Sequence, residues 1–441
     1  EKEPIDGRDV ITTIDVNIQD ITHHALLRQM EYFEADHGCA VVMETATGEI
    51  KAIANLGRTT KGKYYEKRNY AVWESHEPGS TFKLASLMAA LEDRVIDTST
   101  VFDTEKGRIF IHGKKVEDSQ HGGYGKISMA RIFEVSSNVG IVKAIRKHYD
   151  KNPKKFTDRM SEFGLDQMTG VKIKGEGKPI IPLPSDKNRW NKISLEWMAW
   201  GYGVSLTPLQ TLTFYNAVAN NGEMVKPRFI KELRVGNKVE KRFNKVVLKE
   251  KIASQVTIDK VRKVMENVVV KGTADNIFSP NFSMAGKTGT AKKVVNGTYS
   301  NKNYVASFAG FFPAKNPKYS CIVVVHDPKK EKGYYGAIVA APVFKEIAQK
   351  IYTTTPINNQ SVSDTTSIKS IEKDYKSYYT KLQSATKKVP NVKGMSGMDA
   401  ISLLENIGLK VKFSGTGKVA NQSLTKGQEF KKGNTITLKL L

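Results

Sequence analysis

The stretch His76–Arg94, HEPGSTFKLASLMAALEDR, predicts a buried helix that carries a charged amine near its start. Pro78 and Gly79 come just before it, where a helix commonly begins. Its large apolar residues recur at helical spacing, at Leu84, Leu87, Met88 and Leu91. Alanines fill the other faces, and a helix that is apolar nearly all round is normally buried. Ser80 and Lys83 lie one turn apart at its head, so this lysine needs a structural partner or a chemical role.

The pair Ser80 and Lys83 is suited to nucleophilic catalysis if the amine can lose its proton. A serine hydroxyl is a weak nucleophile until a neighbouring base removes its proton. Lysine serves as that base only if its pKa falls well below about 10.4, and burial, a second cation or the positive end of a helix lowers it. The same spacing recurs in the polar tail, at Ser370/Lys373, Ser384/Lys387 and Ser423/Lys426. Those lysines are expected to face solvent, and only the Ser80 copy opens a buried helix.

Two further motifs carry groups that could assist such a serine. Ser136 and Asn138 lie in EVSSNVG between two helical runs, although Ser-x-Asn taken alone is more typical of a turn or a cap and recurs at Ser279/Asn281. Residues 287–290, Lys-Thr-Gly-Thr, taken alone indicate an edge strand with a glycine bulge. The three motifs fall at a helix start, a loop between helices and a sheet edge, which are the positions that the chemistry requires.

Hydrophobic patterns along the chain predict an α+β fold. Residues 14–36 have helical spacing, and residues 38–56 form two β-rich runs around the turn at Thr47-Gly48, which predicts a hairpin. Three later runs predict an antiparallel meander: 284–295, 304–313 and 319–327. A final helix is expected around 341–352. We therefore expect a five-stranded antiparallel sheet covered by helices, with a helical subdomain inserted between its two halves.

The composition changes after Tyr352. Residues 353–387 are polar and lack an apolar period, which predicts a linker, and 371–388 within it could form a short exposed helix. From 388 onward the pattern predicts an extended start, a helix, a strand and a last strand at 434–441. A module of about fifty residues is small for a core, so we expect an appendage rather than a main domain.

Composition excludes several classes of protein. The chain has 441 residues, of which 39% are hydrophobic and 26% charged, as in soluble globular proteins. No run approaches the ~18 consecutive apolar residues of a membrane span, and the abrupt start suggests an excised ectodomain whose anchor is missing. The net charge of +24 is spread along the chain, with 14 Lys against 6 Asp and Glu in 353–441. Because no basic arm or nucleic-acid motif accompanies it, a surface facing anionic lipid or wall polymer is expected, and nucleic acid is not.

Cysteine and histidine usage predicts neither a disulfide framework nor a metal centre. Cys39 and Cys321 each lie in an apolar, strand-like run and are expected to be buried free thiols. The eight histidines include the pair His23-His24, but no spacing resembles a zinc site. The sequence therefore predicts no metal ligands and no cofactor.

The chain resembles the class B penicillin-binding proteins, which are monofunctional peptidoglycan D,D-transpeptidases. Ser-x-x-Lys, Ser-x-Asn and Lys-Thr-Gly together are the motif set of β-lactamases and penicillin-binding proteins. Further segments resemble the family in the family's order over roughly residues 8–350: TIDVNIQ, TGEIKAIAN, EPGSTFK, SSNVG, GYGVSLTPLQ, NNGEMVKP, KGTA, AGKTGTA, FAGFFP and YYGAIVAAPVF. The resemblance implies a penicillin-recognising transpeptidase domain at 8–352 and a linker at 353–387. Residues 388–441 resemble a PASTA module, which implies a small α/β appendage.

The resemblance also implies a role for each motif residue. Ser80 attacks the carbonyl of the penultimate D-alanine of a stem pentapeptide, and Lys83 accepts its proton. Ser136, hydrogen-bonded between Lys83 and Lys287, passes a proton to the departing D-alanine, while Asn138 holds the peptide amide. The backbone N–H groups expected to form the oxyanion hole are those of Ser80 and Thr290. The groups expected to bind the substrate's terminal carboxylate are Lys287, Thr288, Gly289 and Thr290. Lys287 would also help to keep Lys83 unprotonated.

Partners and alternatives follow from the same resemblance. The expected ligands are stem peptides and β-lactams, and the expected partner is a membrane-anchored glycosyltransferase at the outer face of the cytoplasmic membrane. The tail KVANQSLTKGQEF lacks the Ser-Pro often seen in a PASTA module, which leaves its ligand open. Two alternatives remain: a D,D-carboxypeptidase or serine β-lactamase, and a non-catalytic wall-binding sensor, against which the intact motifs argue. The sequence leaves open whether the protein serves division, cell shape or sporulation.

Overall fold

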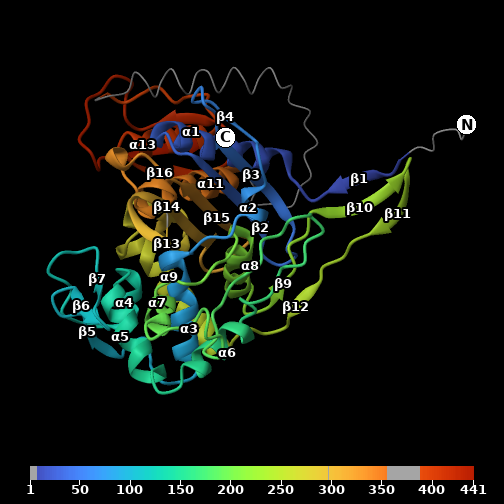
Figure 1. The fold of residues 1–441 in the computed structure, drawn as a ribbon. Coiled ribbons are helices and arrows are strands. Elements are labelled where there is room, and N and C mark those ends of the chain that lie inside the picture. Colours follow the sequence, from blue (N-terminus) through green and yellow to red (C-terminus); the bar gives the residue numbers. More distant parts are fainter. Residues whose placement is uncertain (1–6, 296, 355–387) are drawn as a thin grey trace, which may run out of the picture. The chain divides into compact units, whose positions relative to one another are not determined.

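The computed structural model describes residues 7–295, 297–354 and 388–441 (Figure 1). These residues form two units, one built from the chain up to 278 with 283–344, the other from 279–282 with 345–441. From 355 to 387 the predicted linker, with most of its predicted short helix, lies outside the described residues. The predicted domain boundaries therefore stay predictions.

A six-stranded antiparallel sheet forms the centre of the first unit, in the order β13-β14-β15-β2-β3-β4. Its strands are β2 (His37–Glu44), β3 (Ile50–Arg58), β4 (Tyr64–Tyr65), β13 (Ala285–Val295), β14 (Thr298–Phe312) and β15 (Tyr319–His326). Strands β2 and β15 are buried on both faces, which explains their unbroken apolar runs. Pairing between β15 and β2 joins the predicted meander to the predicted hairpin, and both are confirmed.

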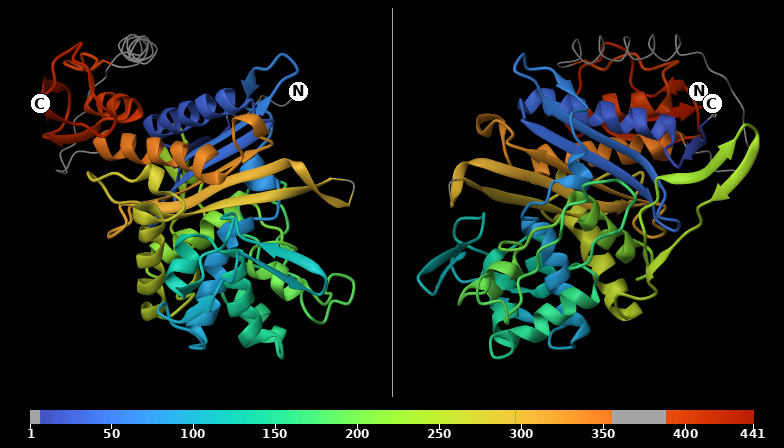
Figure 2. Two further views of the ribbon diagram at one scale, coloured as in Figure 1. Left: turned by 90° about the vertical axis from the view of Figure 1, so that its left-hand side faces the viewer. Right: turned by 45° about the vertical axis from the view of Figure 1, so that its right-hand side comes forward.

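Helices cover both faces of this sheet, as Figure 2 shows. On one face lies α1 (Val16–Phe33), which Asp15 caps by accepting two backbone N–H groups. On the other face α8 (Pro208–Ala219) lies against β14 and β15, α9 (Gln255–Lys271) against β13, and α2 (Tyr70–Trp73) against β2 and β3. The final helix, predicted at 341–352, is α11 (Ala341–Thr354).

The predicted helical subdomain is present, and in the chain it lies between the strands β2–β4 and the strands β13–β15. Its helices are α3 (Lys83–Glu92), α4 (Met129–Glu134), α5 (Asn138–Tyr149), α6 (Pro153–Glu162) and α7 (Ser194–Ala199). Small strand pairs accompany them: β5 (Val101–Asp103) with β8 (Lys126–Ser128), and β6 (Arg108–Ile111) with β7 (Lys114–Glu117). Every residue of α3 from Lys83 to Leu91 is buried, as its all-round apolar pattern predicted.

Shorter elements complete the first unit. A three-stranded sheet contains β1 (Asp9–Thr12), β10 (Ile230–Val235) and β11 (Lys238–Arg242). The remaining elements are β9 (Met224–Val225), paired with β12 (Val247–Lys249), the 3-10 turns η1 (Gly79–Phe82), η2 (Asp275–Ile277) and η3 (Lys330–Lys332), and α10 (Gly336–Val339).

The carboxy-terminal module has its own small core. Helix α13 (Gly397–Asn406) accompanies a three-stranded sheet of β16 (Lys410–Ser414), β18 (Thr435–Leu440) and β17 (Val419–Gln422), in the order β16-β18-β17. The helix and the two predicted strands are confirmed. The outer strand β17 was not predicted, because VANQ is short and only Val419 of its four residues is buried.

Two differences from the predicted sheet have a simple cause. The sixth strand, β4, is two residues long and therefore carries no period that a pattern could reveal. Strand β14 begins at Thr298, six residues before the predicted run, because its first part is a polar hairpin arm. The two cysteines, Cys39 and Cys321, are buried free thiols as predicted.

Gly201→Ala should destabilise the protein more than the matched control Gly203→Ala. Both glycines have positive φ, 91° and 71°, so a Cβ atom strains both backbones. At 201 that atom would lie 1.9 Å from the carbonyl oxygen of Gly79, whereas at 203 it would meet no atom within 4 Å in the described part of the chain. Urea denaturation should show a free energy of unfolding at least about 2 kcal/mol lower for Gly201→Ala than for Gly203→Ala. Equal losses would contradict the close approach of 201 to 79.

Candidate active site

The helix predicted within His76–Arg94 begins as a 3-10 turn and continues as an α-helix. Ser80 lies in η1, and α3 begins at Lys83, whose backbone N–H donates to the Ser80 carbonyl oxygen. Gly79 has φ +55°, and a Cβ atom there would lie 3.1 Å from the Cβ of Ala291 in β13. Glycine thus lets the turn approach the edge of the sheet closely.

The Lys83 side chain is fully buried, and its amine is surrounded by oxygen atoms. Nζ donates to the Ser136 carbonyl oxygen at 2.7 Å and to Asn138 Oδ1 at 2.6 Å, and it lies 3.1 Å from Ser136 Oγ. Burial lowers the pKa of Lys83 to about 7, against a smaller opposing effect of the nearby Asp118 charge. Of the three partners only the Ser136 hydroxyl can itself donate, so a neutral amine still has a partner for its lone pair. Lys83 can therefore act as a base near neutral pH.

The loop between α4 and α5 is held in a strained conformation by Asp118. Ser136 has φ +58°, which is uncommon for a residue with a side chain. Ser137 caps α5, its Oγ accepting the Gly140 N–H at 2.9 Å. Asp118 Oδ2 accepts the Ser137 hydroxyl at 2.8 Å, and its Oδ1 accepts the Val139 N–H at 2.9 Å. These contacts fix the direction in which Ser136 points toward Lys83.

The Asn138 amide is oriented by two partners. Its Oδ1 accepts from Lys83, and its Nδ2 donates to the Glu117 carbonyl oxygen at 2.7 Å. The amide therefore links α3 to the end of β7. The substrate contact expected for Asn138 remains a prediction, since its amide nitrogen is already hydrogen-bonded within the protein.

Strand β13 presents the Lys-Thr-Gly-Thr motif at one edge of the sheet, where alternate backbone groups face away from β14. The Lys287 side chain is fully buried, and Nζ donates to the Thr288 carbonyl oxygen at 3.2 Å. Thr288 Oγ1 is 2.8 Å from the hydroxyl of Thr273, in the KGTA segment. At Gly289 a Cβ atom would lie 2.2 Å from Ser307 Oγ and 2.9 Å from Thr81 Cγ2, so a larger residue would displace both side chains.

Two buried amines share this region, and each disfavours the charge of the other. Burial, together with the charge of Lys83, lowers the pKa of Lys287 well below its usual value. Repulsion between two cations is reciprocal, so the pair holds one proton far more readily than two. Among the described residues no hydrogen bond joins Lys287 to Ser136, so the expected bridge through Ser136 is formed on the Lys83 side only.

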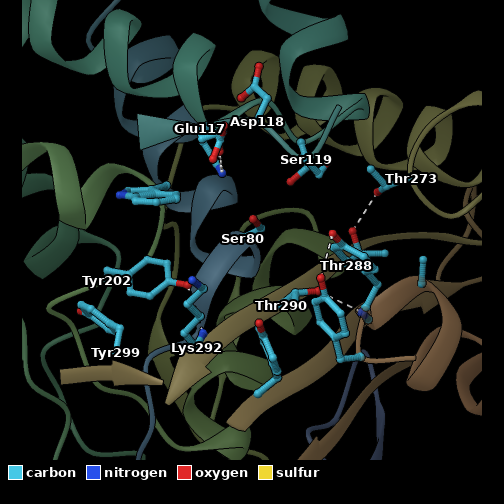
Figure 3. Close-up of a pocket in the computed structure, with 18 of the residues that line it drawn as sticks. Ser80, Glu117, Asp118, Ser119, Tyr202, Thr273, Thr288, Thr290, Lys292 and Tyr299 are labelled. Atoms are coloured by element: carbon cyan, nitrogen blue, oxygen red, sulfur yellow. Dashed lines mark hydrogen bonds between the residues drawn. The ribbon is translucent and has the colours of Figure 1, made fainter. Parts of the chain in front are cut away.

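The motifs meet at a cavity of about 790 Å³ (Figure 3). Ser80 lies between Asp118 and Ser119 on one side and Thr288 and Thr290 on the other. The aromatic residues that line the cavity are Trp197, Trp200, Tyr202, Tyr299, Tyr304, Tyr334 and Tyr335. The cavity therefore offers a nucleophile, hydroxyl groups and apolar ring surfaces to one ligand.

The structure brings together the residues that the sequence singled out. Ser80, Ser136, Asn138, Thr288 and Thr290 line the cavity, while Lys83 and Lys287 are buried. The Ser279/Asn281 copy does not line it.

Sequence reasoning missed several residues that complete the site. Asp118 supports the Ser136 loop, Thr273 contacts Thr288, and Gly336 donates its N–H to Thr290 Oγ1 at 3.0 Å. The KGTA segment of Thr273 and the YYG segment of Gly336 resembled the family, but neither indicated a contact with β13. Asp118 lies in no motif, and only the fold brings it to the loop.

A serine one turn from a buried lysine, facing a Lys-Thr-Gly edge strand across a cavity, defines a candidate serine acyl-transfer site on an α+β fold. Residues 38–349 match the family described as the penicillin binding protein transpeptidase domain. The chain belongs to this family. Residues 387–440 match the PASTA domain.

Individual relatives and solved structures agree with this assignment. The chain is 33% identical to stage V sporulation protein D of Bacillus subtilis over 99% of its own length and 66% of that protein. It is 30% identical to the peptidoglycan D,D-transpeptidase FtsI of Escherichia coli over 80% of its length and 57% of that protein. The penicillin-binding protein 3 structure from Mycobacterium tuberculosis complexed with aztreonam superposes with a TM-score of 0.69 at 28% identity, covering 82% of this chain and 84% of that one. The chain thus spans less than two thirds of the sporulation protein and of FtsI.

The rate of acylation by benzylpenicillin should rise with pH and reach half its maximum near pH 7. Lys83 must be neutral to accept a proton, and its pKa is about 7, so raising the pH through that value increases the fraction of active base. Stopped-flow measurement of the second-order rate constant between about pH 5.5 and 8.5 checks this. Lys83→Met should acylate orders of magnitude more slowly, whereas the exposed control Lys315→Met should keep the wild-type profile. A flat wild-type profile would contradict the assignment of Lys83 as the base.

Asp118→Asn should both slow acylation and shift its pH dependence. The amide oxygen can still accept the Val139 N–H, but the amide NH2 group cannot accept the Ser137 hydroxyl, so that hydrogen bond would have to reverse. The Ser136 loop would then lose its fixed position, and we expect a rate loss of about 10-fold or more. The Asp118 charge favours protonated Lys83, so its removal should move the midpoint below that of the wild type. Asp103→Asn, an exposed change in the same subdomain, is the control. An unchanged midpoint would show that Asp118 does not act on Lys83.

Proposed function

We propose that this protein is a peptidoglycan D,D-transpeptidase that works through an acyl-enzyme on Ser80. The observation that carries the proposal is the buried Lys83 amine, with a pKa of about 7, hydrogen-bonded to Ser136 beside the cavity that Ser80 lines. Membership of the penicillin-binding protein transpeptidase family supports it. So do relatives named as peptidoglycan D,D-transpeptidases.

In the proposed first step Ser80 Oγ attacks the carbonyl carbon of the penultimate D-alanine. Lys83 takes the hydroxyl proton, a C–O bond forms, and the carbonyl oxygen becomes an oxyanion held by the backbone N–H groups of Ser80 and Thr290. One such donor is typically worth about 10²–10³ in rate. Collapse of the intermediate breaks the C–N bond, and Ser136 delivers the Lys83 proton to the departing D-alanine nitrogen. The 3.1 Å contact between Lys83 Nζ and Ser136 Oγ provides the route for this proton.

In the proposed second step Ser80 is the leaving group and an amine is the nucleophile. An amine from a neighbouring stem peptide attacks the ester carbon, its proton returns through the neutral Lys83 amine, and Ser80 leaves with that proton. The product is a cross-link between two stem peptides. A β-lactam would enter the first step as a mimic of D-Ala-D-Ala and would remain attached to Ser80.

We further propose that the substrate carboxylate decides which amine carries the shared proton. Thr288 and Thr290 line the cavity, and Lys287 lies buried in the same strand. A carboxylate bound there would stabilise the charged form of Lys287. Because double protonation is disfavoured, Lys83 would then be left neutral, so a substrate with a terminal carboxylate would activate its own nucleophile.

The remaining proposals concern location and partners. We propose that the protein acts at the outer face of the cytoplasmic membrane with a membrane-anchored glycosyltransferase, as expected for a class B penicillin-binding protein. Among the helices of the described ranges, none has the length and apolarity needed to cross a membrane. The residues 387–440 that match the PASTA domain are proposed to contact the cell wall.

Ser80→Ala should abolish covalent labelling by a fluorescent penicillin and leave the thermal unfolding temperature nearly unchanged. The substitution removes one oxygen atom from a partly exposed side chain, so little packing is lost. Mass spectrometry of the wild-type tryptic peptide should locate the adduct on Ser80. Ser423→Ala, which changes an exposed copy of the Ser-x-x-Lys spacing, should label normally.

The lifetime of the adduct separates the alternatives. A transpeptidase holds the penicilloyl group for minutes or longer, whereas a serine β-lactamase releases it quickly because water attacks the ester. A D,D-carboxypeptidase would release D-alanine from a pentapeptide without an acceptor amine. Failure of the wild type to form any adduct would instead support a non-catalytic wall-binding protein.

A further inference from the structure

Three histidines and a glutamate form a second cluster of titratable groups, outside the cavity of Ser80. His37 begins β2 and His326 ends β15, and the two residues are paired across the sheet. Glu74 follows α2, six residues before Ser80, and His76 lies between them in the chain. The ring centroids of His37 and His326 are 4.2 Å apart, and those of His76 and His326 are 5.2 Å apart. The proposed acyl-transfer chemistry uses none of these groups.

Both ring nitrogens of His37 face carboxylates. Nδ1 is 2.7 Å from Asp36 Oδ2, and Nε2 is 2.7 Å from Glu74 Oε2. The Asp36 side chain is 65% exposed, whereas that of His37 is only 10% exposed. A carboxylate that holds one imidazole nitrogen while the other points inward is the arrangement that orients a histidine toward a metal ion.

The polar atoms of His326 lack the partners that burial demands. The residue is 3% exposed, its Nδ1 has no hydrogen-bond partner among the described residues, and its Nε2 is 3.9 Å from Glu74 Oε2, which is too long for a hydrogen bond. Nδ1 of His76 is also buried without a partner. Buried polar atoms are normally satisfied, so these two Nδ1 atoms are unusual, and they are separate from His326 Nε2, the atom that faces Glu74.

We propose that His37 Nε2, Glu74 Oε2 and His326 Nε2 bind one divalent transition-metal ion, with zinc as the best fit. One ligand atom from each of the three side chains lies within 4.8 Å of the others. Tetrahedral zinc with bonds of about 2.0–2.1 Å needs ligand atoms about 3.3 Å apart. The 2.7 Å contact must therefore open and the 3.9 Å contact must close, each by about 0.6 Å, and the ligand atoms of His37 and His326, which lie within 4.8 Å of one another, must also approach to about 3.3 Å. Because the lone pair of an imidazole nitrogen lies in the ring plane and these two rings are stacked at an interplanar angle of 20°, ion binding also requires one ring to turn out of the stack.

The chemistry of the donors favours zinc over harder cations. Two imidazoles and one carboxylate are the ligand types that suit zinc, whereas magnesium and calcium prefer oxygen alone. The metal would replace the proton between His37 and Glu74, and Asp36 would remain on His37 Nδ1. The Glu74 side chain is 22% exposed, so solvent can reach a fourth position. Lys293, whose charge acts on Glu74, is paired with Asp327 at 2.6 Å, which reduces its repulsion of the ion.

Such an ion would link three elements: β2, β15 and the segment that leads into η1. Strands β2 and β15 lie in the middle of the six-stranded sheet, and Glu74 belongs to the segment that leads into η1. The backbones of His76 and Leu206 already exchange two hydrogen bonds of 3.1 Å in this segment. The proposed metal has a structural role, fixing the path of the chain toward Ser80, and takes no part in acyl transfer. The proposal therefore stands or falls independently of the proposed function.

Titration of the chelator-stripped chain with zinc tests the proposal. Isothermal calorimetry should show one site with a Kd below about 1 μM, and zinc should raise the thermal unfolding temperature. Cobalt(II), used as a spectroscopic substitute, should give the visible absorption of a tetrahedral site. Glu74→Gln and His326→Gln should each weaken zinc binding by about 100-fold or more. Asp36→Asn, an exposed change that keeps a hydrogen-bond acceptor, should weaken it by about 10–100-fold.

The matched control is His23→Gln, which alters the other close histidine pair, on α1. It should leave zinc affinity unchanged. Circular dichroism of each metal-free variant shows whether the fold is kept, and the wild-type cobalt spectrum tests the site even if a ligand variant fails to fold. The proposal is overturned if the wild type binds no stoichiometric zinc, if the affinity is only millimolar, or if both ligand variants bind as tightly as the wild type.

Discussion

Removal of one lysine amine from water is the constraint on which the rest of the site depends. Lys83 is fully buried at the head of a buried helix, where a charged amine is costly unless it is paired. Its partners are oxygen atoms without formal charge, and the nearest carboxylate, Asp118, acts only at a distance. The amine therefore loses its proton near neutral pH. The strained Ser136 is a hydrogen-bond partner of this amine, and the buried Lys287 disfavours its charge. The close approach of η1 to β13 brings Ser80 to the edge strand that carries Lys287.

The surrounding scaffold positions this amine by close backbone contacts. Gly79, Gly201 and Gly289 each lie where a Cβ atom would meet a neighbouring element, so the turn of Ser80 and the edge of β13 approach one another closely. Asp118 adds a rigid support by capping the loop that carries Ser136. Geometry of this kind lowers the entropic cost of bringing nucleophile, base and substrate together.

The histidine cluster belongs to the same scaffold but does not line the cavity of Ser80. His37 and His326 pair across the two central strands, and Glu74 belongs to the segment that enters the turn of Ser80. The sequence indicated no metal site because the three ligands lie 37 and 252 positions apart, far from any zinc-binding spacing. An ion at this position would stabilise the fold by adding to the backbone pairing of β2 with β15 and to the contact between His37 and Glu74.

Local patterns in the sequence determined the buried helix, the hairpin, the meander and the three motifs, because each depends on residues within one or two turns or along one strand. They did not determine β4 and β17, which are too short for a period, nor the start of β14. The sequence already singled out the Ser80 copy of Ser-x-x-Lys, whereas only the tertiary structure showed that it meets Ser136 and Asn138; the copies at Ser370/Lys373 and Ser384/Lys387 lie outside the described residues. The tertiary structure also decided that Asp118, with no motif of its own, supports Ser136. The physical reason is that burial and the resulting loss of charge on Lys83 depend on contacts between residues more than fifty positions apart, which no local spacing encodes.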